Sequence, residues 1–198
     1  MAVLSELFSN AGVFQYGTVD TAAIAFSTEV RRMCEVNTCR QYGKTWACPP
    51  GLGSLEECKK RVQEYEKMVV FSSRYELEDS FDYEGMMAGM SAFKDVCRAI
   101  HRAVKPCMDH FLILSNEGCD LCSTCTYPDA PCRFPDRSHG SLEGYGIMVS
   151  DLAGQAGINY INGADTVTYF GALLCDGSAL EKLEQARALR STGTAETE

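Results

Sequence analysis

Four cysteines in one short, proline-containing segment constrain this chain more than any other feature. Residues 119–132 read Cys-Asp-Leu-Cys-Ser-Thr-Cys-Thr-Tyr-Pro-Asp-Ala-Pro-Cys, so three cysteines lie three residues apart and the fourth follows seven residues later. Thiolates at this spacing can surround an iron–sulfur cube, because a cluster needs several soft ligands that converge. Cys122, which lies between two close neighbours, disfavours a disulfide framework. We therefore expect metal ligation by Cys119, Cys122, Cys125 and Cys132.

The spacing departs from the bacterial ferredoxin pattern in one respect. In that pattern the fourth cysteine follows the third more closely and directly precedes a proline. Here the gap is longer, and Arg133 and Phe134 separate Cys132 from Pro135. The identity of the fourth ligand is therefore open at the level of sequence.

A second group of cysteines lies earlier in the chain. Cys34, Cys39 and Cys48 are five and nine residues apart, in a segment that Gly43 and the Pro49-Pro50 pair prevent from forming a regular element. A loop of this kind can direct thiolates inward while its amides donate hydrogen bonds to cluster sulfurs. We expect these three cysteines to be further ligands, and buried apolar packing is the alternative.

The number of candidate ligands bears on the cofactor, which we predict to be one or two 4Fe-4S clusters. Two closed clusters, each held by four thiolates, would need one thiolate more than the two segments supply. Cys107 could provide it, one iron could lack a protein thiolate, or a single cluster could draw on both segments. Zinc is the alternative metal, although its sites usually use two separate Cys-x-x-Cys pairs and the three histidines show no ligand spacing.

Several polar residues near these segments could bind a substrate or surround the metal. Arg40 and Arg133 each follow a proposed ligand, so they could balance cluster charge or bind an anionic substrate. The full set of candidates is Arg40, Lys44, Tyr127, Arg133, His139 and Glu143.

Composition and charge narrow the class of protein. The 198 residues carry a formal charge of −9, which disfavours nucleic-acid binding because that function needs a basic surface. No apolar run reaches the roughly 18 residues of a membrane span, and no secretion signal is recognisable. Eleven cysteines without such a signal favour ligation over disulfides and a cytoplasmic location. The partner would be a redox protein or a small anionic substrate, and the oligomeric state is open.

The pattern of apolar residues predicts one metal-binding domain over residues 1–190 and a disordered tail over 191–198. We expect an α+β fold with a small mixed or antiparallel sheet of three to four strands, about five helices, and the cysteine-rich loops at one end. No glycine-rich phosphate loop supports a doubly wound fold. Cys58, Cys97 and Cys175 belong to apolar faces and should be core residues. The predicted helices are residues 27–35, 86–104 and 142–156, together with one that follows the capping box Ser54–Glu57 and one that opens at a capping box Ser178–Glu181. The predicted strands are residues 68–72, 110–114, 159–161 and 166–174. Residues 2–19 should be loop-rich.

Taken together, the two cysteine segments resemble a specific family. Cys39 to Pro50 and Cys119 to Pro135, followed by Ser-Leu-Glu-Gly-Tyr-Gly-Ile at residues 141–147, are similar to a cysteine-rich family of anaerobic prokaryotes. That family is a domain of unknown function described as predicted metal-binding, and the similarity extends from about Val19 to Cys175. The resemblance implies metal binding by the seven motif cysteines and implies no reaction.

The sequence thus predicts an iron–sulfur protein in redox work, either electron transfer or reduction of a small molecule. Whether the chain is an enzyme is open. One alternative is a non-redox enzyme whose open cluster iron acts as a Lewis acid or accepts sulfur. Another is a zinc-binding interaction module without catalysis.

Overall fold

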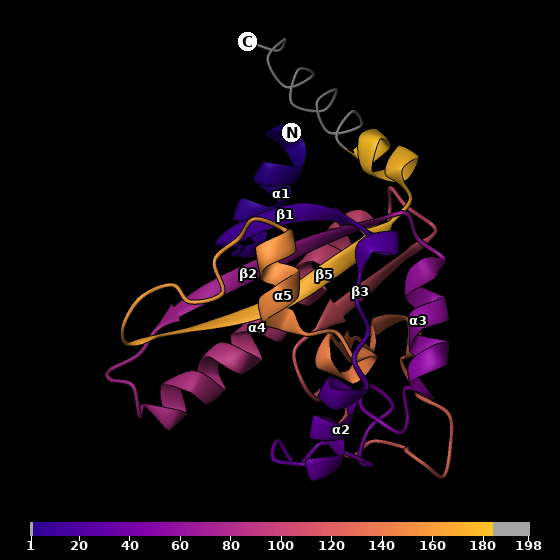
Figure 1. The fold of residues 1–198 in the computed structure, drawn as a ribbon, viewed down its shortest axis with the longest axis vertical. Coiled ribbons are helices and arrows are strands. Elements are labelled where there is room, and N and C mark those ends of the chain that lie inside the picture. The colour runs from indigo at the N-terminus through magenta and orange to yellow at the C-terminus, as the bar shows by residue number, and fades with distance from the viewer. Residues whose placement is uncertain (1, 184–198) are drawn as a thin grey trace, which may run out of the picture.

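A computed structural model describes residues 2–183 and shows a five-stranded sheet between two layers of helices (Figure 1). The strand order is β1-β2-β5-β3-β4, and all neighbours are antiparallel except β3 and β4. The strands are β1 Gln15–Asp20, β2 Lys67–Glu76, β3 Phe111–Ser115, β4 Gly140–Ser141 and β5 Thr166–Cys175. The helices are α1 Ala2–Ala11, α2 Thr28–Val36, α3 Leu55–Gln63, α4 Tyr83–Val104 and α5 Val149–Gln155, with short 3-10 turns at Thr21–Ala23, Pro135–Arg137 and Glu143–Tyr145. Residues 177–183 are also helical.

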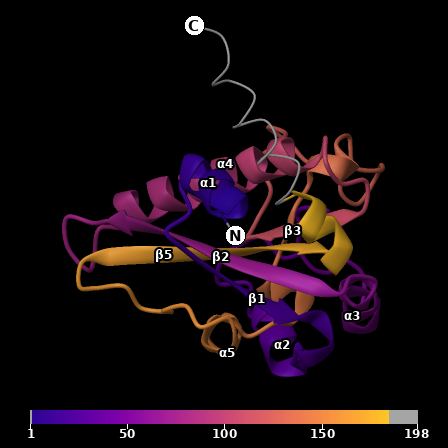
Figure 2. The ribbon, with the colours of Figure 1, turned by 90° about the horizontal axis from the view of Figure 1, so that it is seen from above.

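The central strands are apolar on both faces because both faces are covered. In β2, Val69 and Phe71 face α1 and α4, whereas Met68 and Val70 face the opposite layer. Figure 2 shows α1 and α4 on one side of the sheet and α2 and α5 on the other. The sheet therefore has two apolar cores, one on each face.

The long helix α4 forms the main cover of one face. Its side chains at positions 93, 97, 100 and 104 are fully buried, which confirms the apolar seam predicted over residues 86–104. Asp82 caps the helix by accepting a hydrogen bond from the Gly85 amide at 2.8 Å. Cys97 belongs to this core, and Cys58 and Cys175 are equally buried elsewhere, as predicted.

The opposite face is covered by α3, α5 and the turns between them. Ser54 and Glu57 form the predicted capping box, in which the Ser54 amide donates to Glu57 Oε2 at 2.7 Å. Cys58 and Val62 then face the sheet from α3. These contacts place the loops before α3 against the end of the sheet where the cysteine segments lie.

The α+β fold with a mixed sheet is confirmed, but three predicted details are wrong. Residues 2–19 form α1 and β1 instead of a loop-rich region, because Leu4, Leu7 and Phe8 bury a helical face against α4. The sheet has five strands, since it includes β1 and β4, which the apolar pattern does not predict. Residues 159–161 form no strand, and Ile161 is 79% exposed.

Two predicted helices differ in their limits. The helix expected over 142–156 is confined to α5, because Gly146 adopts a left-handed conformation (φ 75°) after a 3-10 turn. The final helix already includes residue 177, so the Ser178–Glu181 capping box is wrong. Residues 184–190 and the predicted tail 191–198 lie outside the described residues.

Candidate metal centre

The loop that follows β3 folds back on itself and brings its four cysteines together. The Thr126 hydroxyl donates to the Pro131 carbonyl at 2.8 Å, and the Arg133 guanidinium donates to the Thr124 carbonyl at 2.9 Å. These bonds close the long gap before the fourth cysteine. As a result Cys119, Cys122, Cys125 and Cys132 line one small pocket, which we call the four-cysteine pocket.

Hydrogen-bond donors already approach two of these sulfurs. The Phe134 amide donates to Cys132 Sγ at 3.4 Å, and the Ser138 hydroxyl lies 3.9 Å from Cys119 Sγ. All four cysteines are half-buried and none forms a disulfide. Such donors stabilise thiolates and would raise the reduction potential of a cluster bound there.

The three earlier cysteines line a second pocket of about 390 Å³, the three-cysteine pocket. Cys34 lies in the last turn of α2, Cys39 in the exposed turn that follows, and Cys48 in a buried part of the loop. The helix ends at Asn37, which is left-handed (φ 61°) and accepts a hydrogen bond from the Tyr42 amide at 3.0 Å. This turn directs the chain from α2 back across the pocket.

Burial raises the pKa of two cysteines in the three-cysteine pocket, Cys34 and Cys48. It raises the pKa of Cys34 to about 11, and Arg31 opposes this only in part. Burial also raises the pKa of Cys48, while the Gly118 amide acts in the opposite direction. In the absence of a metal these groups are thiols at neutral pH, so metal binding would release protons.

Two carboxyl groups, Glu117 and Glu143, line the same pocket. Glu143 keeps an exposed surface at the pocket, yet protein atoms surround its carboxyl closely, and this crowding raises its pKa to about 7. The Glu143 backbone carbonyl lies 3.9 Å from Cys34 Sγ. A protonatable group therefore faces the cavity beside the three thiols.

The two pockets are neighbours, because two chain segments contribute to both. In the early segment, Trp46 lines the four-cysteine pocket and Cys48 lines the three-cysteine pocket. In the late segment, Cys119 lines the four-cysteine pocket and Glu117 lines the three-cysteine pocket. The indole of Trp46 donates to the Ala130 carbonyl at 3.1 Å. Its ring meets Tyr127 edge-on, with centroids 4.9 Å apart. The early and late cysteine segments are thus in direct contact at one end of the sheet (Figure 1).

The remaining predicted residues are distributed unevenly. Arg133 lines the four-cysteine pocket and Glu143 the three-cysteine pocket, whereas Arg40 and Lys44 are exposed and line neither. His139 lines neither cysteine pocket and instead pairs with His101. Cys107 is exposed after α4 and also lines neither pocket.

A cationic group that was not predicted from the sequence lies next to the four-cysteine loop. Lys94, Arg98 and Arg137 share a narrow crevice with Cys119, and Lys94 is only 9% exposed. Arg98 also donates to Asp120 Oδ1 at 2.7 Å. The sequence shows that basic or histidine residues at 94, 98, 101 and 105 follow the helical period and so share one side of α4, but not that this side faces the cysteine loop.

Within residues 2–183, no three histidine, cysteine or acidic side chains converge closely enough to bind a single metal ion as they stand. Nor is any described helix both long and apolar enough to cross a bilayer.

Comparison with known proteins agrees with the cysteine pattern. No curated protein and no solved structure matches the chain. A family model described as "Predicted metal-binding protein (DUF2284)" matches residues 17–175, which include all seven cysteines of the two pockets and the sheet that positions them, except for the first two residues of β1. This match covers most of the sequence, so the chain belongs to that cysteine-rich family of predicted metal-binding proteins.

Proposed function

We propose that this protein is an iron–sulfur protein that carries out redox work with clusters bound at the two cysteine pockets. The observation that supports this most directly is the grouping of the seven motif cysteines around two adjacent pockets, four at one and three at the other. Cys119, Cys122, Cys125 and Cys132 would bind the first cluster. Cys34, Cys39 and Cys48 would bind the second.

The spacing of the cysteines favours a cluster over a zinc ion. Zinc sites built from thiolates usually use two separate Cys-x-x-Cys pairs, whereas Cys119, Cys122 and Cys125 lie three residues apart in one loop and line one pocket with Cys132. Such a run of thiolates is typical of iron–sulfur proteins.

The surrounding charge also favours a cluster, because a thiolate-bound cluster is an anion. In a chain with a formal charge of −9, such an anion needs local compensation. Lys94 and Arg137 lie beside Cys119, and Arg133 lines the pocket itself, whereas Arg98 in the same crevice is already paired with Asp95 and Asp120. Lys94, Arg137 and Arg133 would supply positive charge where the four-thiolate cluster would lie.

The three-cysteine pocket would leave one iron without a thiolate. Cys107 does not line this pocket, whose wall instead offers the carboxyl groups of Glu117 and Glu143. A cluster bound here would supply electrons and a Lewis-acidic position. The protein itself would supply a carboxyl group near neutral pKa and apolar walls from Met33 and Tyr160.

This division of ligands favours reduction of a small molecule over electron transfer alone. Cys119, Cys122, Cys125 and Cys132 would hold a cluster suited to electron transfer, and Cys34, Cys39 and Cys48 would hold one beside a cavity of about 390 Å³ that a small molecule could enter. The same open position would suit a non-redox enzyme that uses an iron as a Lewis acid. Redox activity of the bound cluster separates these two functions.

The first experiment measures iron, sulfide and zinc in protein purified without oxygen. We expect a brown protein with broad absorption near about 400 nm, as thiolate-bound clusters show. Cys122→Ser should lose about four irons, the content of one cube. Cys97→Ser, in the core, and Cys107→Ser, on the surface, should lose none.

Two results would contradict the proposal. One is colourless protein with stoichiometric zinc and no sulfide. The other is equal iron content in Cys122→Ser and Cys107→Ser. Cys48→Ser tests the second pocket separately, since it should reduce the iron content while the four-cysteine cluster remains.

A further inference from the structure

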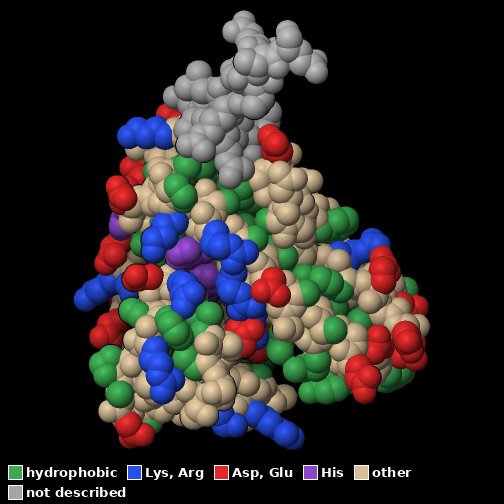
Figure 3. All heavy atoms as spheres, turned by 180° about the vertical axis from the view of Figure 1, so that it is seen from behind, with side chains coloured by type: hydrophobic (Ala, Val, Ile, Leu, Met, Phe, Trp, Pro, Cys, Tyr) green, Lys and Arg blue, Asp and Glu red, His purple; other side chains and the backbone are tan. Residues whose placement is uncertain are grey.

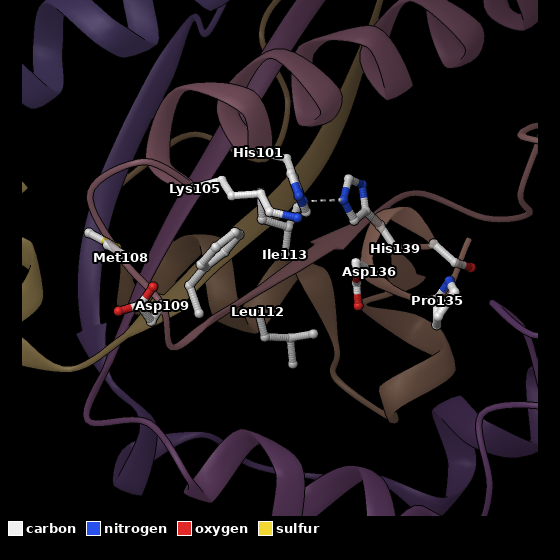
Figure 4. Close-up of a pocket in the computed structure, with 11 residues that line it drawn as sticks. His101, Lys105, Met108, Asp109, Leu112, Ile113, Pro135, Asp136 and His139 are labelled. Carbon is white, nitrogen blue, oxygen red and sulfur yellow. Dashed lines mark hydrogen bonds between the residues drawn. The ribbon is translucent and has the colours of Figure 1, made fainter. Parts of the chain in front are cut away.

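A third cavity, on the other side of the four-cysteine loop, contains an unusual pair of histidines. It has a volume of about 430 Å³, within the range of small-molecule sites, and we call it the histidine pocket. His101 and Lys105 reach it from the end of α4, while β3 provides Leu112 and Ile113 (Figure 4). The segment that follows the four-cysteine loop supplies His139.

The histidines are arranged so that one ring nitrogen is left without a partner. His139 Nε2 lies 3.2 Å from His101 Nδ1, and one of these atoms donates a hydrogen bond to the other. His101 is only 8% exposed, and its Nε2 is buried with no hydrogen-bond partner among the described residues. A buried polar nitrogen without a partner costs free energy, which a ligand could recover.

Positive charge surrounds this pair. Figure 3 shows Lys and Arg side chains gathered around the histidines on this face of the molecule. Burial is the main cause that lowers the pKa of His101, followed by Lys105; Asp136 acts in the opposite direction, and Arg137 and Arg102 lower this pKa further. None of the three cations forms an ion pair with a carboxylate within the described part of the chain.

The pocket also contains acceptors and an apolar wall. Asp109 and Asp136 line it, and both are exposed. Phe111 meets the His101 ring edge-on at 5.1 Å and provides an apolar surface. A ligand that fits all of these groups combines an anionic end with hydroxyl groups that can donate to the carboxylates.

We propose that the histidine pocket binds a small phosphate ester, with its phosphate between Lys105 and the His101 ring and its hydroxyl groups toward Asp109 and Asp136. In this proposal His139 Nε2 donates to His101 Nδ1, so the neutral His101 ring carries its proton on Nε2 and can donate to a ligand that reaches it. An anion with several oxygens suits donors that approach from different segments. The net charge of −9 repels anions in general, so affinity for phosphate would have to come from this local group of cations. The inference does not depend on the proposed clusters.

The pocket would nevertheless place its ligand close to the metal centre. Ser138 lines both the histidine pocket and the four-cysteine pocket, and its hydroxyl lies 3.9 Å from Cys119 Sγ. The wall between the two cavities is thus one short segment, Pro135–Arg137 and the two residues that follow it. A ligand in the histidine pocket would therefore lie next to Ser138 and could alter the contact between the Ser138 hydroxyl and Cys119 Sγ.

The test is isothermal titration calorimetry of the purified protein with inorganic phosphate and with glycerol 1-phosphate. We expect both to bind, and the ester to bind more tightly because only it can reach Asp109 and Asp136. Lys105→Ala should weaken binding at least about tenfold, the equivalent of one charge-assisted hydrogen bond. Lys105→Arg should restore most of the affinity. Lys60→Ala, an exposed lysine of α3 with the same change in charge, should alter affinity by less than about twofold.

Other results would overturn the proposal. They are absence of binding by either probe, equal affinity for the two probes, and equal losses in Lys105→Ala and Lys60→Ala. His101→Phe adds a second check, since it retains an apolar ring and removes both ring nitrogens. It should weaken binding of both probes while the circular dichroism spectrum stays unchanged. Because calorimetry with these anions requires no iron, failure here would leave the cluster proposal standing, and colourless protein would leave this one standing.

Discussion

Replacement of Trp46 tests how the two cysteine segments are connected. This residue is the only tryptophan in the chain, and its indole N–H donates to the Ala130 carbonyl at 3.1 Å. Its ring also packs edge-on against Tyr127. Trp46→Ala removes both contacts, whereas Trp46→Phe removes the hydrogen bond and retains an aromatic ring. We expect both variants to loosen the loop 119–132 from the loop that carries Cys48.

The expected cost follows from the contacts that are lost. The hydrogen bond contributes about 1 kcal/mol and the aromatic pair about another 1 kcal/mol, with some lost apolar contact besides. Trp46→Ala should therefore favour the open loop by about 2–3 kcal/mol, or about 30- to 160-fold in the opening equilibrium. Trp46→Phe should favour it by about 1 kcal/mol, or about fivefold. The apolar cores of the sheet do not include Trp46, so the domain should stay folded.

The assay is the rate of iron release to a chelator in protein prepared without oxygen. Release should be fastest in Trp46→Ala, intermediate in Trp46→Phe and slowest in the unchanged protein. Phe81→Ala is the matched control, because Phe81 is 91% exposed and belongs to neither cysteine pocket. Equal release rates in Trp46→Ala and Phe81→Ala would refute the idea that Trp46 connects the two segments.

Three further predictions concern protonation and packing. Burial, and after it His101 and Arg98, lower the pKa of His139 from 6.5 to about 4, so the unfolded chain takes up the proton at a higher pH than the folded chain does. The free energy of unfolding, measured with urea, should therefore fall by up to about 3 kcal/mol between pH 6.5 and 4, and His139→Gln should reduce this fall. In metal-free protein, Cys34 should react slowly with iodoacetamide until the pH approaches its pKa of about 11, and rapid reaction at about pH 8 would contradict its burial. Gly17→Ala should destabilise the domain by about 1–3 kcal/mol, because an added Cβ would lie 1.9 Å from the Ala156 carbonyl oxygen, whereas Gly154→Ala in α5 meets nothing within 4 Å and should be neutral or stabilising.

The elements predicted correctly from the sequence are those whose signals are long or chemically specific. Helix α4 shows six apolar positions at helical spacing, and α3 begins with a capping box, so both could be identified without tertiary information. Helix α1 buries Leu4, Leu7 and Phe8 on one short face, and that face is stable because α4 lies opposite. Residues 159–161, expected to form a strand, do not join the sheet, and Tyr160 instead stacks on Phe170.

The candidate site could be predicted as a set of cysteines but not as two pockets. Spacing alone could not show that Cys34 shares a cavity with Cys48, because a left-handed turn at Asn37 brings them together. Nor could it show that Arg40 faces solvent while Lys94 lies against the cysteine loop. Those outcomes depend on which side of α2 and α4 contacts the loops, and side-chain type does not encode that choice.

The apolar cores of this protein lie on the two faces of the sheet, and none of the seven cysteines that line the two pockets contributes a central contact to either. The sheet and its two cores would therefore stay folded without the proposed clusters. A chain that lost such a cluster to an oxidant would keep its fold and could bind a new one.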